Sequence, residues 1–424
     1  MKIRQSFTEI RNGFHPTFWV ANGMELFERL AYYGQATVLS IFLRDHLHFN
    51  EIEAGEISSV FGGLLWMFPI VAGTLADKFG FRRAFSVAFA MLAIGYFLIG
   101  TTGMTAFAGV YNGLPLYWVL IAMFIFTAIG GSFIKPSVLG TVAATSRPET
   151  KSLGYAVYYW LVNIGGATGP AIAFFVRDTA GIAYVYLVSS MSCAAMFLVN
   201  AFFYKNVEPT EPIPVESLLT KFRNLIVVLS NWKFMVFLII FSLYWIMFWQ
   251  IYIVIPFYIT DYISKDAPFE IIQSTGAWGI IALQLVVNRL TKRLPTGAAL
   301  VAGFATCTVS WLLIALHPSV WVIVGSLLVW SLGEMTQAPR YYEYISGLAP
   351  RGQQGLFQGF GFLPIAIAWL VGGPFGGWLY ATFAKTSHPS TVWYSIFAVG
   401  VAATVLMAVY NKFVVMHDTN QRTA

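Results

Sequence analysis

Charged residues are scarce in this chain. Of its 424 residues, 58% are apolar and only 10% are Asp, Glu, Lys or Arg, whereas soluble domains carry about 25% charged residues. So few charges cannot cover the surface of a soluble protein, which excludes a soluble enzyme or a nucleic-acid-binding domain. The composition therefore predicts a polytopic protein of the cell membrane.

Cysteines and known catalytic signatures are also sparse. The two cysteines, Cys193 and Cys307, lie in apolar runs, so no disulfide framework is expected. No nucleotide-binding G-x-x-x-x-G-K-[ST] loop occurs, so energy for transport would have to come from an ion gradient. We expect no enzymatic activity, no metal site, no cofactor and no cleavable signal peptide.

The chain contains long stretches without Asp, Glu, Lys or Arg. A helix needs about 20 apolar residues to cross a bilayer. With a further span at 17–43, which holds three charges, the stretches account for twelve spans, because two of them are long enough for two spans and break near 109–115 and at His317-Pro318. The fold class expected is an all-α membrane protein with 12 transmembrane helices. The uncharged stretches are 57–76, 84–134, 152–176, 179–204, 234–260, 271–288, 294–333, 352–384 and 386–411.

Basic residues fix the expected orientation. An even number of spans places both termini on one side, and Lys and Arg concentrate on that side, as at Arg11, Lys78 and Lys205. The positive-inside rule then makes both termini cytoplasmic. This bias also explains the net charge of +6 without any nucleic-acid partner. The loops on the other side hold only Arg44, Arg177, Lys265 and Lys385.

The spans divide into two halves. The stretch 205–232 is rich in Pro, Glu and basic residues and predicts a cytoplasmic linker between a six-helix bundle at 1–204 and a second one at 233–424. Glycine and proline stand six residues apart at corresponding positions, in GGSFIKP of span four and in GEMTQAP of span ten. Two such halves with a solute site near the midplane are typical of secondary transporters.

Ionisable residues inside the spans are the main functional candidates. Each costs roughly 2.5–3.5 kcal/mol at a helix centre, so such residues persist only when they pair or face a cavity. The sequence has seven: Glu25, Glu28, Arg29, Lys135, Glu334, Arg340 and Glu343.

Three of these charges share one face of span one. Glu25 lies three residues before Glu28 and four before Arg29, and Tyr32 continues the stripe. Two carboxylates beside one guanidinium leave one acid without a full partner, and such an acid can carry a proton. The alternative is a static ion pair that ties two helices.

The remaining charges fall on spans four and ten. Lys135 and Glu334 lie in opposite halves and could hold the two ends of a zwitterion, or could be interhelical ties. Arg340 and Glu343 are three apart near the cytoplasmic end of span ten, which favours a local pair with a gating or structural role.

A glycine-rich loop joins spans two and three. GTLADKFGFRR fits G-x-x-x-D-x-x-G-x-R-R and resembles the loop signature of the major facilitator superfamily. Its glycines suit a tight turn, and its charges suit helix ends and lipid phosphates. We therefore assign a gating role to Asp77, Arg82 and Arg83.

Four motifs resemble the proton-dependent oligopeptide transporter family. ELFERLAYYG is similar to its E-x-x-E-R-F-x-Y-Y-G, FIKP to its F-x-K-P, and YYWLVNIGG to its F-Y-x-x-I-N-x-G. GEMTQAPRYYEYISGLAP resembles its G-E-x-x-x-x-P…A-P segment. The chain departs from the family pattern at Trp66, where Tyr is frequent, and at Trp249, where many members have an acid. Its linker is also too short for the two extra helices of many bacterial members.

This resemblance implies a proton-coupled symporter of the major facilitator fold that imports small zwitterions, with di- and tripeptides foremost. By matched position, Glu25, Glu28 and Arg29 would serve proton coupling, with protons as the coupling ion and no other cofactor. The expected solute-binding residues are Arg29, Tyr32, Tyr33, Lys135, Asn163, Trp245, Gln250 and Glu334.

Other functions stay open. GGATGP in span five partly resembles an element of drug/proton antiporters, so a proton-driven exporter of amphipathic compounds is the second hypothesis. A symporter of another small organic anion and a membrane receptor are further ones. The expected partners are a small solute and the lipid bilayer, and we expect a monomer.

Overall fold

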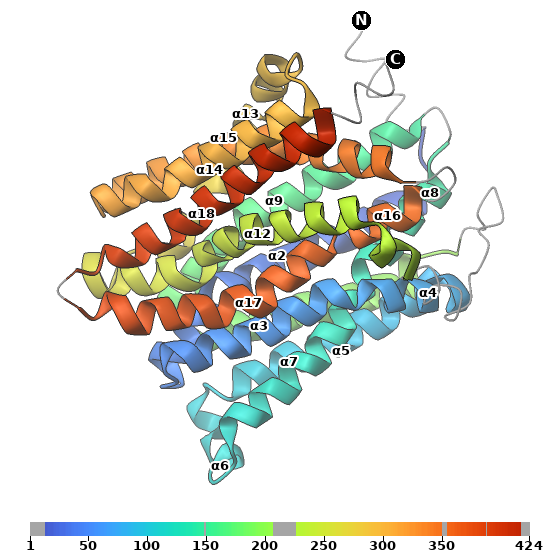
Figure 1. The fold of residues 1–424 in the computed structure, drawn as a ribbon. Coiled ribbons are helices and arrows are strands. Elements are labelled where there is room, and N and C mark those ends of the chain that lie inside the picture. The colour runs from blue at the N-terminus through green and yellow to red at the C-terminus, as the bar shows by residue number, and fades with distance from the viewer. Residues whose placement is uncertain (1–12, 148–149, 207–225, 350–353, 387, 417–424) are drawn as a thin grey trace, which may run out of the picture. The chain divides into compact units, whose positions relative to one another are not determined.

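The computed structural model describes residues 13–147, 150–206, 226–349, 354–386 and 388–416. The described chain is almost entirely helical, and a single antiparallel bridge joins Phe14 to Ser146. Figure 1 shows the helices, of which the first in chain order are α2 (Pro16–Ile41), η1 (Phe42–His46), α3 (Glu51–Met67), α4 (Pro69–Phe79), α5 (Phe81–Thr101), η2 (Thr105–Phe107), α6 (Ala108–Tyr111), α7 (Leu116–Ser132), α8 (Ile134–Thr145), α9 (Lys151–Thr179) and α10 (Ala183–Phe203).

The later helices follow the linker region, of which residues 207–225 lie outside the described part of the chain. Three of them are π-helical turns at the ends of longer helices. In order they are α12 (Trp232–Tyr258), η4 (Ile259–Ile263, π), α13 (Phe269–Thr291), α14 (Thr296–Leu316), α15 (Val320–Leu348), α16 (Gln354–Phe360), α17 (Leu363–Leu379), η5 (Tyr380–Ala384, π), α18 (Thr391–Tyr410) and η6 (Asn411–Val415, π).

The expected spans are present as helices. Ten helices of the described chain are long and apolar enough to cross a membrane, and an eleventh is added if the bent pair α3 and α4 counts as one span. The remaining expected span corresponds to α2, whose 26 residues include Glu25, Glu28 and Arg29. The predicted breaks are confirmed, because α14 ends at Leu316 and α15 begins at Val320, where the Ser319 side chain accepts a hydrogen bond from Val322 N.

The two halves differ in their proline-containing span. Span four is interrupted at Phe133, so that Pro136 lies in the first turn of the separate helix α8. Pro339 instead lies inside the continuous helix α15. The equal glycine–proline spacing therefore does not produce equal local structure.

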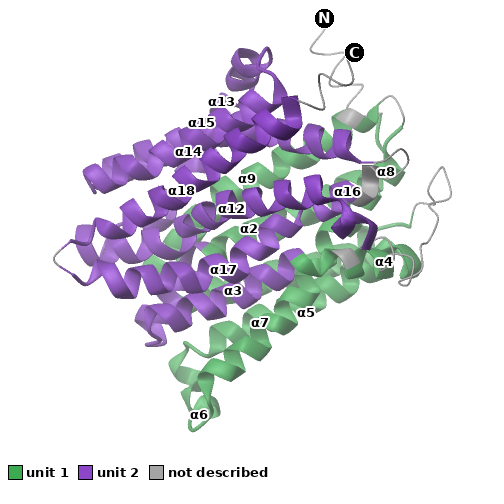
Figure 2. Ribbon diagram, in the orientation of Figure 1, with its two compact units in different colours: residues 1–36, 67–218 green, residues 37–66, 219–424 purple. Residues whose placement is uncertain are grey.

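The chain forms two compact units (Figure 2). Unit 1 comprises residues 1–36 and 67–218, and unit 2 comprises residues 37–66 and 219–424. In unit 1, α5 packs against α7 and α10; in unit 2, α14 packs against α15 and α18, and α12 against α17. The boundary between residues 218 and 219 falls within the predicted linker 205–232, but residues 37–66 group with the later part of the chain rather than with the first expected bundle.

Glycines bring two helices of unit 2 into main-chain contact. A Cβ atom added at Gly55 of α3 would overlap the carbonyl of Gly373 in α17, and one added at Gly377 would overlap the carbonyl of Glu51. Only glycine fits at such contacts, which are frequent between membrane helices. These contacts join residues 37–66 to unit 2.

Candidate functional site

The three charges of α2 form one buried cluster in unit 1. Arg29 Nε donates to Glu28 Oε2 at 2.5 Å, and Arg29 Nη2 pairs with the same oxygen. Arg29 Nε also lies 3.4 Å from Glu25 Oε1. All three side chains are buried, so the guanidinium neutralises carboxylates that would otherwise carry a large desolvation cost. The predicted grouping of these residues on one helical face is present.

Tyrosines surround this cluster. Tyr158 of α9 donates its hydroxyl to Glu25 Oε1 at 3.5 Å, and the Arg29 guanidinium lies 4.9 Å from the centre of the Tyr32 ring. Tyr33 packs edge-on against Tyr32. The other carboxylate oxygen, Glu25 Oε2, is buried and accepts no hydrogen bond from the described residues. A proton on this carboxyl would therefore break no existing contact at Oε2.

Lys135 joins the cluster from α8. It follows the break at Phe133 and is partly exposed, close enough to Glu25, Glu28 and Arg29 for their charges to act on it. Unit 1 thus gathers two acids and two bases, whose charges cancel when all four are ionised. Adding one proton leaves one positive charge in excess, which a solute carboxylate can compensate.

Two glycines of α9 set the position of Arg29. A Cβ atom added at Gly165 would lie 2.5 Å from Arg29 Cβ, and one added at Gly169 would lie 2.7 Å from the Leu30 carbonyl oxygen. These glycines are four residues apart, the small-xxx-small spacing that lets membrane helices approach closely. Both glycines belong to the GGATGP segment, which partly resembles an element of drug antiporters, and here they allow α9 to pack closely against α2.

Glu334 lies in unit 2 among aromatic side chains. It is partly exposed on α15, one turn after Trp330, and its charge acts on Tyr244 and Cys307. Within its own unit, Glu334 forms no ion pair with a described residue. Trp330 stacks on Tyr244 with ring centroids 5.2 Å apart.

A second aromatic stack lies on α12 and α17. The ring centroids of Trp249 and Trp369 are 4.1 Å apart, and those of Trp249 and Trp245 are 6.1 Å apart. Trp245 is partly exposed, whereas the other two indoles are buried. Trp249, one of the expected departures from the family pattern, is thus a packed member of an apolar stack.

Two of the predicted solute-binding residues, Asn163 and Gln250, donate hydrogen bonds to main-chain carbonyls. Asn163 donates its side-chain nitrogen to the Tyr159 carbonyl, one turn earlier in α9, at 2.8 Å. Gln250 is buried and donates its nitrogen to the carbonyls of Ile246 and Gly372 at 2.8 and 3.0 Å. Its amide nitrogen therefore ties α12 to α17.

The predicted gating residues of unit 1 lie around a glycine turn. Gly80 separates α4 from α5 with a φ of 88°, a left-handed conformation that favours glycine. Arg82 donates to the Ala201 carbonyl at 2.5 Å and accepts at its own carbonyl from Asn200, which ties α5 to the end of α10. Asp77 and Arg83 are exposed beside this turn.

The predicted gating residues of unit 2 form a local pair, as expected from their spacing. Arg340 Nη1 lies 2.7 Å from Glu343 Oε2, and Arg340 Nη2 donates to the Lys292 carbonyl at 3.2 Å. This second contact joins α15 to the end of α13. A structural role for the pair is consistent with these contacts.

Sequence reasoning missed a network around Arg44. The guanidinium pairs with Asp45 at 2.5 Å and with both oxygens of Asp261 at 2.8 and 2.9 Å, and it lies 4.4 Å from the Phe257 ring centre. Tyr380 donates to Asp261 Oδ2 at 2.6 Å. Burial alone would lower the pKa of Arg44, but hydrogen bonds to the two aspartates outweigh it and raise that pKa. The available signal was the presence of opposite charges at the ends of two spans.

The chain matches the sequence profile of the Major Facilitator Superfamily over residues 24–335. The chain belongs to this superfamily. It is therefore a multi-pass membrane protein. Dipeptide and tripeptide permease A of Yersinia pestis is 27% identical over 233 residues, which cover 51% of this chain and 43% of the relative. The first curated relatives are thus matched over less than half of their length.

Other similar proteins are matched over most of their own length and most of this chain. The permease A of Salmonella typhi is 22% identical over 84% of this chain and 82% of its own, and Multidrug resistance protein MdtH of Photorhabdus laumondii is 20% identical over 81% of both. A POT family transporter solved with 5-aminolevulinic acid superposes with a TM-score of 0.75 at 17% identity, covering 93% of this chain and 96% of that one. The resemblance expected from the four motifs is confirmed, and the solved structure supports the fold.

Proposed function

We propose that this protein is a secondary transporter, not an enzyme, and that it imports small zwitterionic solutes, di- and tripeptides foremost, together with protons. The observation that carries the proposal is the buried set of two acids and two bases in unit 1. The charges of this set balance when neither proton nor solute is bound. The set therefore accepts a proton and a solute carboxylate more readily together than separately. Such mutual dependence is what coupling requires.

Each charged residue has a proposed role in this scheme. The Glu25/Glu28 pair takes up the proton as a coupled pair, because both carboxylates share the Arg29 guanidinium. Arg29 and Lys135 receive the solute carboxylate, and Glu334 receives the solute amino group. Tyr32, Tyr33, Asn163, Trp245 and Gln250 complete the proposed solute-binding set.

The remaining roles concern gating and location. Asp77, Arg82, Arg83, Arg340 and Glu343 are proposed to hold cytoplasmic helix ends together, in keeping with the contacts of Arg82 and Arg340 to the carbonyls of neighbouring helices. We propose an inner-membrane monomer with both termini in the cytoplasm. Protons are its coupling ion, and no other cofactor is needed.

Uptake by the purified protein in liposomes tests the proposal. With an acidic exterior, we expect the wild type to accumulate alanylalanine against its gradient. Glu28→Gln should abolish this accumulation but retain exchange of labelled for unlabelled peptide, because exchange needs no net proton movement. Accumulation by Glu28→Gln equal to that of the wild type would refute the coupling role. A thermal-shift screen of peptides, amino acids and organic anions identifies other solutes.

A second candidate function is proton-driven export of amphipathic compounds. The similarity to Multidrug resistance protein MdtH over most of both chains and the Trp245–Trp249–Trp369 stack favour it. Inside-out vesicles distinguish the two, because an exporter would release protons from the vesicle lumen when an amphipathic cation is added. Peptide uptake without such release supports the importer.

A further inference from the structure

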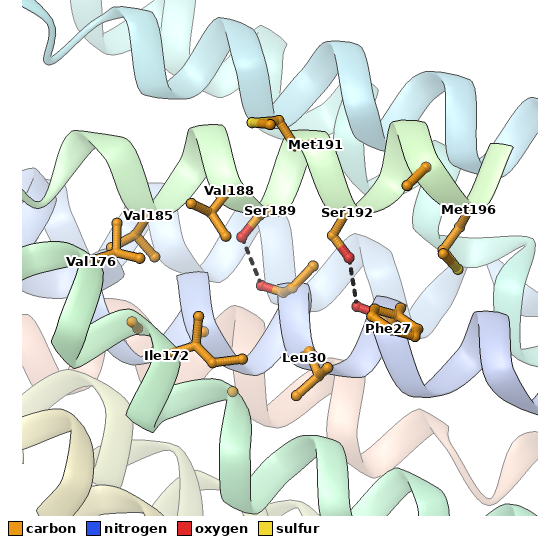
Figure 3. Close-up of a pocket in the computed structure, with 15 residues that line it drawn as sticks. Phe27, Leu30, Ile172, Val176, Val185, Val188, Ser189, Met191, Ser192 and Met196 are labelled. Atoms are coloured by element: carbon orange, nitrogen blue, oxygen red, sulfur yellow. Dashed lines mark hydrogen bonds between the residues drawn. The ribbon is translucent and has the colours of Figure 1, made fainter. Parts of the chain in front are cut away.

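An apolar groove of about 400 Å³ lies between α2, α9 and α10 in unit 1 (Figure 3). Ligand pockets typically have volumes of about 300–1,000 Å³. Phe27, Leu30, Ala31 and Gly34 line it from α2 with helical spacing. At 3.6 residues per turn this stripe lies roughly opposite the one that carries Glu25 and its charged neighbours. The groove is therefore distinct from the charged cluster, although both lie on the same helix.

The lining offers a ligand hydrocarbon contacts and little else. Its two hydroxyl side chains are already engaged: Ser189 donates to the Ala31 carbonyl and Ser192 to the Phe27 carbonyl, each at 3.2 Å (dashed lines in Figure 3). The other lining side chains are apolar. A polar ligand would lose its bonds to water here without replacing them, so the groove fits an alkyl chain.

The groove opens onto the surface of membrane-spanning helices. Met191 is 63% exposed, and Phe27, Ile172 and Val188 at the rim are also exposed. Met191 and Val188 belong to α10, and Ile172 to α9, both of which are long and apolar enough to cross a bilayer. A ligand therefore reaches the groove from the hydrocarbon of the bilayer rather than from water.

A basic residue, Arg177, directly follows Val176, which is a lining residue of α9. Arg177 follows the lining residue Ala173 by four positions on α9, which places both on the same side of the helix. Arg177 is only partly exposed, its guanidinium stacks near the Phe174 ring, and it lies in the last turn of α9. A guanidinium at the end of a membrane helix complements a lipid phosphate.

We propose that this groove binds one acyl chain of a membrane phospholipid whose phosphate meets Arg177. The acyl chain would fill the space left by the small residues that line the groove, such as Ala31, Gly34, Ala173 and Ala195. It would brace α2 against α9 and α10 on the side opposite the charged cluster. The lipid thus becomes part of the support of that cluster, whichever solute the protein carries.

Photolabelling in liposomes tests the occupant. The full chain is reconstituted with phosphatidylglycerol that carries a diazirine in one acyl chain, irradiated, and mapped by mass spectrometry. We expect adducts to concentrate on Met191 and Met196. Ala195→Trp fills the groove and should lower this labelling severalfold. Ala194→Trp adds the same side chain at a neighbouring exposed position that does not line the groove, and should leave the labelling unchanged.

Retention of lipid provides a second measurement that needs no bulky side chain. Native mass spectrometry should find one phospholipid fewer on Arg177→Ala than on the wild type, whereas Arg177→Lys should retain it. The proposal is overturned if both tryptophan variants are labelled like the wild type, if adducts are spread evenly over exposed residues such as Leu198 and Phe202, or if Arg177→Ala keeps its lipid.

Discussion

Replacing Gly165 by alanine tests how the charged cluster is held. The added Cβ would lie 2.5 Å from Arg29 Cβ, whereas carbon atoms prefer about 3.5–4.0 Å. The helices α2 and α9 must therefore separate by about 1 Å. Overpacking of this kind typically costs about 1–3 kcal/mol of folding free energy.

The same shift moves the whole cluster on α2 away from its partner on α9. Tyr158 of α9 donates to Glu25 Oε1 at 3.5 Å, so a displacement of this size takes the contact beyond hydrogen-bond length. A misplacement of about 1 Å in functional geometry can reduce a rate by about 10²-fold. We therefore expect peptide uptake by Gly165→Ala to fall much further than the amount of folded protein.

Gly23→Ala is the matched control. Gly23 lies on the same helix as Arg29, and no atom of another group stands within 4 Å of its added Cβ. Alanine in a helix interior gains about 0.5–1 kcal/mol over glycine, so this variant should melt slightly higher and transport normally. Melting curves and liposome uptake are measured for both variants. A Gly165→Ala protein with wild-type melting and uptake would refute the packing argument.

Three further variants probe stability away from the cluster. Arg44→Ala should lower the free energy of unfolding by about 2 kcal/mol, because Asp261 loses its charged donor and the site is partly exposed; an unchanged urea midpoint would contradict this. Burial raises the pKa of Tyr204 to about 12, against a hydrogen bond that lowers it. Since free tyrosine titrates near pH 10, its stabilising contribution is present below that pH and lost towards pH 12. Tyr204→Phe should therefore show a shallower loss of melting temperature over this range, and parallel curves would count against the assignment. Gly373→Ala should destabilise the protein by steric overlap between α3 and α17, whereas Gly325→Ala, which has open space around its Cβ, should not; equal melting temperatures would argue against the contact.

Local spacing explains what the sequence could predict. Residues three and four apart on a helix are neighbours by geometry alone, so the contact of Arg29 with Glu25 followed directly from their positions, whereas its contact with the adjacent Glu28 did not. The helix breaks at 109–115 and 317–318 were likewise marked by Gly, His and Pro. These features need no knowledge of which helices are adjacent.

Features that depend on tertiary contacts escaped prediction. Arg44 and Asp261 are separated by 217 positions in sequence, and no local pattern relates them. Gln250 is an expected solute-binding residue, and no local pattern showed that its nitrogen also bonds the carbonyl of Gly372 on another helix. The role of Gly165 also became visible only once α9 was found against Arg29.

The glycine contact between α3 and α17 has a consequence for reversible motion. Where main chains touch directly, there are no rotamers to rearrange when the two surfaces part. The contacts at Gly55 and Gly377 involve main-chain atoms, whereas Trp369 and Leu370 of α17 pack over Gly62 and Gly63 farther along α3. The Gly55–Gly377 end can therefore re-form in the original register without first unlocking interdigitated side chains. In the proposed transporter, a helix contact of this kind would separate and re-form in each transport cycle with few side-chain rearrangements.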